Sequence, residues 1–282
     1  MAYKTILVHV DESKHTSIRV EIAAGLASRE GAHLIGVAVS GADSLSGRAA
    51  TKKLSTQGTG LPALPSRISA ELALGEFARI ARRIGVSSIE KRLVDDAAVN
   101  AVSLTSWFAD LVIVGQTDPS EKLHMVEPDF PEYIAMTSIS PTLIVPIHRS
   151  EGPVGTNILV SWDGSRAARR TIVGALPFMQ RASIVQLVTF CPGQRHLDGK
   201  TQREDAGEIA LFLARHGVET NFIEQSCSQN GIGGDLLELA ADRLVNLIVM
   251  GCYGHSRLSE MLFGGVSRYV LSTMNVPLLM MH

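Results

Sequence analysis

The segment from residue 251 to residue 268, GCYGHSRLSEMLFGGVSR, holds the residues of this sequence that are best suited to chemistry. It contains one pair of glycines spaced three apart and a second pair side by side. Glycines let backbone N–H groups approach a ligand because no Cβ blocks the way, and the N-terminus of a helix expected from Val266 favours a phosphate group. The segment therefore predicts a phosphate-binding loop. Side chains that could add charge or a hydroxyl there are His255, Arg257, Ser267 and Arg268.

Asp163 is a second candidate, because it directly follows the apolar run ILVSW and its carboxylate could accept a hydrogen bond from a ribose hydroxyl. Open α/β sheets bind ligands beyond the carboxyl ends of their strands, where the strand order reverses. Asp163 would face the glycine loop if the strands that precede the two are neighbours. A structural interpretation stays open. The Asp-x-Ser patterns at Asp163 and Asp11 are also helix N-cap signals, and glycines can serve backbone geometry alone.

The elements that must position these residues occur twice along the chain. Residues 4–13 read KTILVHVDES and residues 156–165 read TNILVSWDGS, an offset of 152. Residues 110–115 (DLVIVG) match residues 246–251 (NLIVMG) at an offset of 136, and PTLIV matches PLLMM at that same offset. The change of offset places 152 − 136 = 16 extra residues in the first copy. The sequence is therefore interpreted as a duplication of one unit.

Within each copy, apolar runs of about five residues alternate with longer amphipathic stretches. This alternation is typical of a parallel sheet covered by helices on both faces, and right-handed connections then give a doubly wound open sheet. We expect Ser40–Ser66, rich in Gly and Ser, to be a long mobile loop, and 151–153 to join two domains, 1–150 and 151–282. The strands are predicted near residues 4–10, 33–39, 88–94, 111–115, 142–146, 156–162, 183–190, 218–225, 246–251 and 277–281.

Composition and charge limit the function classes. The chain has 282 residues, enough for two domains, and 26 Lys+Arg against 28 Asp+Glu give a net charge of −2. Near-zero charge argues against a nucleic-acid-binding protein. No run approaches the ~18 apolar residues of a membrane span, and the N-terminus lacks a signal-peptide pattern, so we expect a soluble, cytoplasmic protein without a membrane partner. The three cysteines lie far apart, which predicts neither a disulfide framework nor a zinc ribbon.

At the glycine loop the sequence resembles the universal stress protein family in its tandem form, and the resemblance covers nearly the whole chain. Nucleotide-binding members carry G-x2-G-x9-G-(S/T), which Gly251, Gly254 and Gly264 match. Gly265 departs from this pattern and would lose one hydroxyl contact to phosphate while keeping its N–H. The resemblance implies two tandem flavodoxin-like (adenine nucleotide alpha hydrolase-like) α/β domains, each a five-stranded parallel sheet of order 3-2-1-4-5 with helices on both faces. It also implies pairing through the fifth strand, with the two halves forming a pseudo-dimer and two chains forming a homodimer.

The resemblance further implies a stress-response sensor or regulator that binds ATP or AMP, with or without Mg²⁺, in its second half. Asp163 would hold the ribose, and the end of the second strand of that half, near Thr189, would border adenine. Two alternatives stay open, a slow ATPase in which Glu260 positions a water and a nucleotide-free interaction scaffold. The residues expected to bind the nucleotide are Asp163, Thr189, Met250, Gly251, Gly254, His255, Gly264, Gly265, Val266 and Ser267.

The first half keeps the pattern of the unit but not its glycines. Asp118, Pro128 and Asp129 stand where the second half has three of its loop glycines, and Pro128 has no N–H to donate. The carboxylates of this loop, which include Glu121 and Glu127, would repel a phosphate by about 1 kcal/mol or more per pair. The basic residues within the loop do not balance them. We therefore expect one nucleotide per chain.

No catalytic constellation and no metal-ligand spacing stands out elsewhere in the sequence. His9 lies in an apolar strand, which is typical of a core histidine. Cys252 could be redox-sensitive or simply a small residue of the glycine loop. Residues 231–235, GIGGD, resemble a fragment of a dinucleotide fingerprint at the wrong spacing, and a flexible helix start is the simpler interpretation.

Overall fold

The computed structural model describes residues 2–40, 67–121, 129–148, 152–190, 202–229, 231–252 and 265–282. By their internal contacts these residues form two compact units, Tyr3–Ile134 and Ala135–His282 with Met1–Ala2. All but the first residue of the expected loop Ser40–Ser66 lies outside the described residues. The domain boundary expected after residue 150 stays a prediction.

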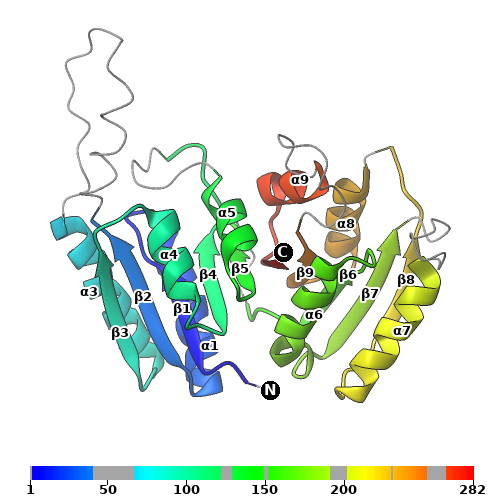
Figure 1. Cartoon of the computed structure of the whole chain (residues 1–282), viewed down its shortest axis with the longest axis horizontal. Helices are drawn as coiled ribbons and strands as arrows, with labels where there is room; N and C mark the ends of the chain where they lie inside the picture. The colour runs from blue at the N-terminus through cyan, green and yellow to red at the C-terminus, as the bar shows by residue number, and fades with distance from the viewer. Residues whose placement is uncertain are drawn as a thin grey trace, which may run out of the picture. The chain divides into compact units, whose positions relative to one another are not determined.

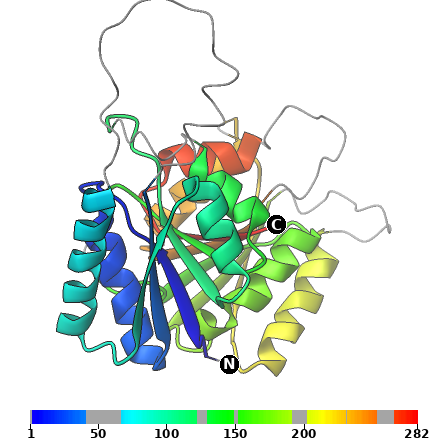
Figure 2. The ribbon, with the colours of Figure 1, turned by 60° about the vertical axis from the view of Figure 1, so that its left-hand side comes forward.

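The Tyr3–Ile134 unit is built on four parallel strands in the order β3-β2-β1-β4. Helices α1 and α3 lie side by side on one face of these strands, and α4 lies on the other (Figure 1, Figure 2). The strands are β1 (Thr5–His9), β2 (His33–Val39), β3 (Ile89–Val94) and β4 (Leu111–Gly115); the helices are α1 (Thr16–Glu30), α3 (Arg67–Ile84) and α4 (Ala98–Ser106), and α5 (Phe130–Thr137) runs across the division between the units.

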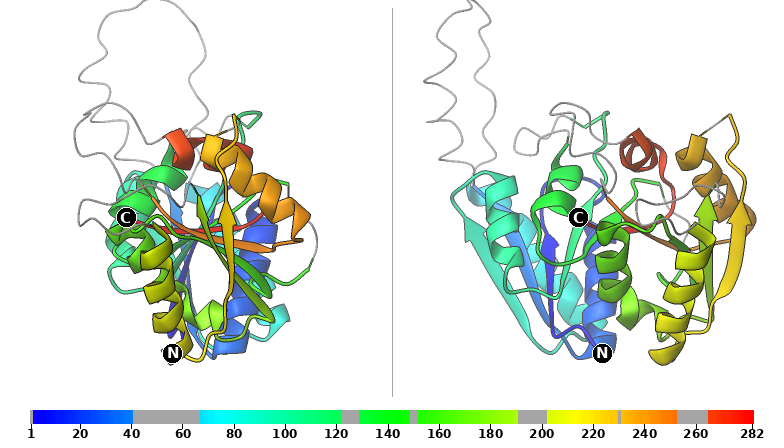
Figure 3. Two further views of the ribbon diagram at one scale, coloured as in Figure 1. Left: turned by 90° about the vertical axis from the view of Figure 1, so that its right-hand side faces the viewer. Right: turned by 45° about the vertical axis from the view of Figure 1, so that its right-hand side comes forward.

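The Ala135–His282 unit contains the strand order β10-β9-β6-β7-β8, all parallel. In chain order this is 3-2-1-4-5 read from the other edge, as expected. Figure 3 (left) shows α7 and α8 on opposite faces of this sheet. The strands are β6 (Asn157–Ser161), β7 (Ile184–Phe190), β8 (Asn221–Gln225), β9 (Leu247–Gly251) and β10 (Leu278–Met281); the helices are α6 (Arg166–Met179), α7 (Gln202–Arg215), α8 (Gly231–Asp242) and α9 (Gly265–Thr273).

One further strand of this unit, β5 (Thr142–Val145), comes from the first sequence repeat and pairs antiparallel with β10. Leu143 lies opposite Leu279, and these two residues are equivalent at the repeat offset of 136. On either side of this pair the partners are exchanged. Ile144, the equivalent of Met280, faces Leu278, and Thr142, the equivalent of Leu278, faces Met280. The two equivalent strands therefore meet about a local twofold axis, the arrangement of a symmetric interface.

Burial explains why these segments form the sheets. The residues of β4 from Leu111 to Val114 are completely buried, and so are those of β9 from Leu247 to Val249, as near-continuous apolar runs in a parallel sheet must be. Each of the ten strands expected from the sequence is present, with its ends shifted by at most three residues. In the described ranges, no helix is both long enough and apolar enough to cross a membrane.

Candidate functional site

The carboxyl ends of β6 and β9 lie side by side in the second unit. Ser161, the last residue of β6, is in register with Met250 of β9. Asp163 therefore follows its strand at the edge of the sheet where Gly251 ends the neighbouring one. The structure thus brings together the two features on which the sequence argument depended, the carboxylate after the first strand of the repeat and the start of the glycine loop.

Asp163 also organises the turn into α6. Its Oδ1 accepts a hydrogen bond from the backbone N–H of Ser165 at 2.9 Å, across Gly164, whose φ of +74° favours glycine. Ser165 is the N-cap of α6, and its Oγ accepts the N–H of Ala168 at 3.0 Å. The Asp-x-Ser signal is therefore a true helix start, with Ser165 as the cap and Asp163 holding the turn before it.

The two described glycines of the loop differ in what surrounds them. A Cβ on Gly251 would lie 2.4 Å from the backbone nitrogen of Ala168, so close packing of α6 against β9 requires glycine there without any ligand. Gly265 is exposed, and nothing in the described ranges lies within 4 Å of a Cβ placed on it. The structural interpretation of the glycines thus holds for Gly251, while no described residue gives a packing reason for glycine at position 265.

Helix α9 begins at Gly265, one residue before the start expected from the sequence. Val266 is half-buried, and Ser267 is buried within the first turn of the helix. The remaining predicted phosphate-binding residues lie outside the described part of the chain, and so do Arg257 and Glu260. Those predicted residues are Gly254, His255 and Gly264.

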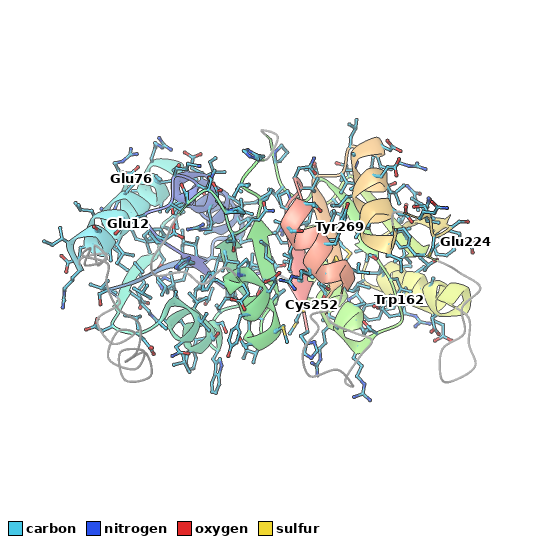
Figure 4. All side chains as sticks on the ribbon, turned by 90° about the horizontal axis from the view of Figure 1, so that it is seen from above. Glu12, Glu76, Trp162, Glu224, Cys252 and Tyr269 are labelled. Carbon is cyan, nitrogen blue, oxygen red and sulfur yellow. The ribbon has the colours of Figure 1, made fainter. Side chains whose placement is uncertain are left out.

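Two buried polar atoms near the ends of β6 and β7 lack hydrogen-bond partners in the described structure. Thr189, expected beside adenine, is completely buried, and its Oγ1 has no partner. Trp162 follows β6, is 8% exposed, and its Nε1–H has none either (Figure 4). Since the register of β6 and β7 pairs Ser161 with Val188, Trp162 and Thr189 are the next neighbours across the two strands. Sequence reasoning missed Trp162, although it is the single aromatic residue of the run ILVSW.

In the first unit, Asp11 occupies the position equivalent to Asp163, and a cation lies beside it. Oδ1 of Asp11 lies 2.9 Å from Nη2 of Arg19, a guanidinium that is itself 3% exposed. Oδ1 also accepts hydrogen bonds from the Thr16 hydroxyl and from the N–H of Ser13. Burial alone would raise the pKa of Asp11, but Arg19, and to a lesser degree His9 and these hydrogen bonds, lower that pKa to about 2. The carboxylate is therefore ionised and already satisfied.

Arg19 also occupies the space above Gly115, the last residue of β4. A Cβ on Gly115 would lie 2.3 Å from Nη1 of Arg19, and the Nε–H of Arg19 donates to the backbone oxygen of His9 at 2.8 Å. In the second unit the equivalent position, at the offset of 152, is Thr171, whose hydroxyl donates to the backbone of Ala167 at 2.8 Å. A buried guanidinium therefore fills the strand ends of the first unit, where the second has a short hydroxyl side chain.

Two carboxylates of the acidic loop of the first unit have basic partners from another loop, which the loop sequence alone did not indicate. Nζ of Lys14 lies 3.0 Å from Asp118 and 3.7 Å from Glu121, and Nε2 of His15 lies 3.1 Å from Asp118. The basic residues within the loop, Lys122 and His124, lie outside the described residues, so the expectation about them stays a prediction. The partners of Asp118 and Glu121 come instead from the loop after β1. Glu127 and Pro128 lie outside the described residues.

A cavity of about 440 Å³ opens between α1 and α3 in the first unit. Its polar end is formed by the loop after β1, including Asp11 and Glu12, and its apolar side by α3, including Leu72 and Phe77. Glu12 and Glu76, both of which line it, are marked in Figure 4. The cavity is thus mixed in character, with both carboxylates and apolar side chains in its lining.

The remaining candidates have structural explanations. His9 is 1% exposed and its ring lies 4.8 Å from that of Phe130, so it is a core histidine, and burial lowers its pKa to about 4. Cys252 is completely buried, which raises the pKa of its thiol to about 12 and makes it unreactive. Helix α8 starts at Gly231, and Asp235 accepts the N–H of Ser228 at 2.8 Å. These contacts support a plain helix start.

One cysteine departs from the expectation drawn from sequence spacing. Cys227 is disulfide-bonded, although the wide separation of the three cysteines predicted no disulfide framework. Cys227 follows β8 by two residues, at the same edge of the sheet as the other strand ends. Distance along the chain is a poor guide to such a bond, because parallel strands far apart in sequence end next to each other in space.

Comparisons with known proteins place this architecture. No curated protein sequence matches the chain. A universal stress protein from Archaeoglobus fulgidus is similar in structure over 98% of this chain and 97% of its own, with a TM-score of 0.69 and 16% identity. A functionally unknown protein from Pseudomonas aeruginosa is similar over 99% of this chain and 92% of its own, with a TM-score of 0.61 and 15% identity. At such identities the likeness concerns the fold, two flavodoxin-like α/β domains in tandem.

The sequence of the second half also matches a protein family. The profile that describes the universal stress protein family matches residues 156–282. This range begins at β6 and includes every strand and helix that surrounds Asp163, Thr189 and Gly251. The C-terminal half of the chain, residues 156–282, therefore matches the universal stress protein family.

Proposed function

We propose that the C-terminal half binds an adenine nucleotide, ATP or AMP, and that the protein acts as a nucleotide-dependent sensor or regulator in a stress response. The observation that carries this proposal is the Thr189 hydroxyl, completely buried at the end of β7 and without a partner in the described structure. Buried polar groups are nearly always hydrogen-bonded, so an unsatisfied one beside a predicted ligand site favours a polar ligand there. The amino group or a ring nitrogen of adenine would satisfy it.

The described residues fit the other parts of such a ligand. Asp163 follows β6 beside the end of β9, where a carboxylate can accept from the ribose hydroxyls. The N-terminus of α9, from Gly265 to Ser267, directs backbone N–H groups and the positive end of the helix dipole to a phosphate. Met250 would border the base. The proposal extends to Gly251, Gly254, His255, Gly264 and Val266 of the same segment.

The first half is proposed not to bind nucleotide, for a reason different from simple repulsion. Asp11 is held by Arg19 and Thr16, so it has no capacity left for a ribose. The guanidinium of Arg19 fills the space over Gly115. A nucleotide would have to displace a buried ion pair, which costs several kcal/mol. One nucleotide per chain is therefore expected.

The test is binding of ATP and of AMP, measured by native mass spectrometry and by the shift in melting temperature at millimolar nucleotide. We expect one nucleotide per chain. Gly265→Ser, which restores the family pattern at an exposed position, should tighten binding, and Gly265→Asp should abolish it through repulsion of the phosphate.

The matched control lies in the first half. Asp129 is equivalent to Gly265 at the offset of 136, and Asp129→Gly should leave binding unchanged. Equal losses in Gly265→Asp and in a comparable substitution of Asp129 would refute the one-site assignment. Absence of any nucleotide, bound or added, would refute nucleotide binding and favour the scaffold alternative.

A further inference from the structure

The loops after β1 and β4 bring three side chains of different chemistry together in the first unit. β1 and β4 are neighbouring parallel strands, so the segments that follow them meet at one edge of the sheet. His15 stands just before α1, and Asp118 and Glu121 lie in the loop after Gly115. One potential ligand atom from each of these three side chains lies within 4.8 Å of the other two.

Two of the three ligand atoms already lie at the spacing of a metal site. With bonds of about 2.1 Å, two ligand atoms at a tetrahedral metal are about 3.4 Å apart. Nε2 of His15 and Oδ2 of Asp118 are 3.1 Å apart. Oε2 of Glu121 is buried and accepts no hydrogen bond within the described residues, so a turn of this carboxylate can complete the set without breaking a contact of that atom.

The surroundings hold the ligands in the form that a metal requires. Oδ1 of Asp118 accepts the N–H of Ser120 at 2.8 Å and its hydroxyl at 2.6 Å, which leaves Oδ2 facing His15. Ser120 would thus act as the outer-shell partner that orients the Asp118 carboxylate.

A cation already occupies the position between the carboxylates. The ammonium of Lys14 contacts Asp118 at 3.0 Å and Glu121 at 3.7 Å, and the Lys14 side chain is 59% exposed. It can therefore turn into solvent without loss of buried packing. The backbone N–H of Lys14 separately donates to Oε1 of Glu121 at 3.3 Å, a contact that does not depend on the Lys14 side chain.

We propose that His15, Asp118 and Glu121 form a reversible site for a divalent transition metal of the Zn²⁺ or Co²⁺ type, with Lys14 as the internal cation that the metal displaces. One imidazole and two carboxylates suit these metals better than Mg²⁺, which prefers oxygen ligands alone. Three protein ligands leave coordination positions for water, as in exchangeable or catalytic sites and unlike closed structural ones. The proposal is independent of nucleotide binding in the other half.

The experiment is a titration of the chelator-treated full chain with Co²⁺, followed by its visible absorption and then by competition with Zn²⁺. We expect one Co²⁺ per chain, displaced by Zn²⁺. His15→Ala should weaken binding by at least about tenfold. Lys14→Met removes the rival charge and keeps the backbone N–H, so it should tighten binding by about tenfold.

His33 provides the matched control. Its Nε2 lies 3.2 Å from a single carboxylate, that of Glu90, so His33→Ala should leave the titration unchanged. No Co²⁺ absorption up to millimolar metal would overturn the proposal, and so would equal affinities of the wild type and His15→Ala. If His15→Ala does not fold, Lys14→Met decides alone, since unchanged affinity in that variant is equally contrary to the proposed displacement.

Discussion

Replacing Arg19 by Met tests whether the ion pair with Asp11 supports the first unit. Met keeps an apolar side chain in the core but removes the charge, so Asp11, which is only 13% exposed, is left buried without its partner. Removing one partner of a buried pair typically costs about 3–5 kcal/mol, and we expect Arg19→Met to lower the free energy of unfolding by about 4 kcal/mol at pH 7.

The pH dependence identifies the electrostatic part of that loss. The pKa of Asp11 falls from 3.8 to about 2 on folding, so this carboxylate stabilises the wild type above pH 3.8 and loses its effect as the pH falls through 2. The shift from 3.8 to about 2 corresponds to about 2.5 kcal/mol at about 1.36 kcal/mol per pKa unit. Without Arg19, burial instead raises this pKa. The wild type loses about 1 kcal/mol of this contribution by pH 3, and the variant gains stability as its buried carboxylate is protonated, so the difference between them should shrink by more than about 1 kcal/mol between pH 7 and pH 3.

Urea denaturation of the full chain, followed by hydrogen exchange of peptides from β1, reports on this unit separately from the other. The double variant Asp11→Asn/Arg19→Met should be more stable than Arg19→Met alone, because no buried charge remains unpaired. A difference that is constant from pH 7 to pH 3 would show that Arg19 acts by packing only, and the electrostatic reasoning would be wrong.

Three further outcomes follow from burial and close contact. The pKa of His9 falls from 6.5 to about 4 on folding, so the unfolded chain binds a proton at higher pH than the folded protein does. The free energy of unfolding of the wild type should therefore fall by about 3 kcal/mol between pH 6.5 and pH 4. In His9→Leu, urea denaturation at both pH values should show that this loss is absent. Gly251→Ala places a methyl group 2.4 Å from the backbone of Ala168, and should cost about 1–3 kcal/mol in thermal unfolding, whereas Gly265→Ala should stay within about 0.5 kcal/mol. The Cys252 thiol, completely buried, should resist alkylation in the native protein and react after denaturation, as peptide mass spectrometry can verify; rapid native labelling would contradict its burial.

The sequence predicted the sheets well because central parallel strands must be apolar on both faces. Runs such as Leu111–Val114 have no other good interpretation between helical stretches, and the repeat offsets fixed their equivalents in the other half. The start of α6 was predictable because a serine at this position has a well-defined local role, which is to cap the helix by accepting a backbone N–H, as Ser165 does. Each of these signals lies within a few consecutive residues, so it can be recognised from the sequence alone.

The first-half site could not be predicted in the same way, because its contacts join distant elements. Arg19 reaches the end of β4 from the second turn of α1, and Lys14 reaches the acidic loop more than 100 residues away. One signal was available, since Arg19 stands where the other repeat has Thr171. The loop charges alone suggested repulsion, whereas the folded loops place cations and carboxylates together.

The pairing of β5 with β10 has a consequence for assembly. Strands that join separate chains associate only at sufficient concentration, whereas here both belong to one polypeptide and only residues 146–156 separate β5 from β6. The covalent chain sets the local concentration of β5 and β10, so their pairing does not depend on protein concentration and is lost only when this unit unfolds. β10 also has β9 on its other side, so neither of its edges is open to a second copy. A homodimer of this protein must therefore form through a surface other than β10.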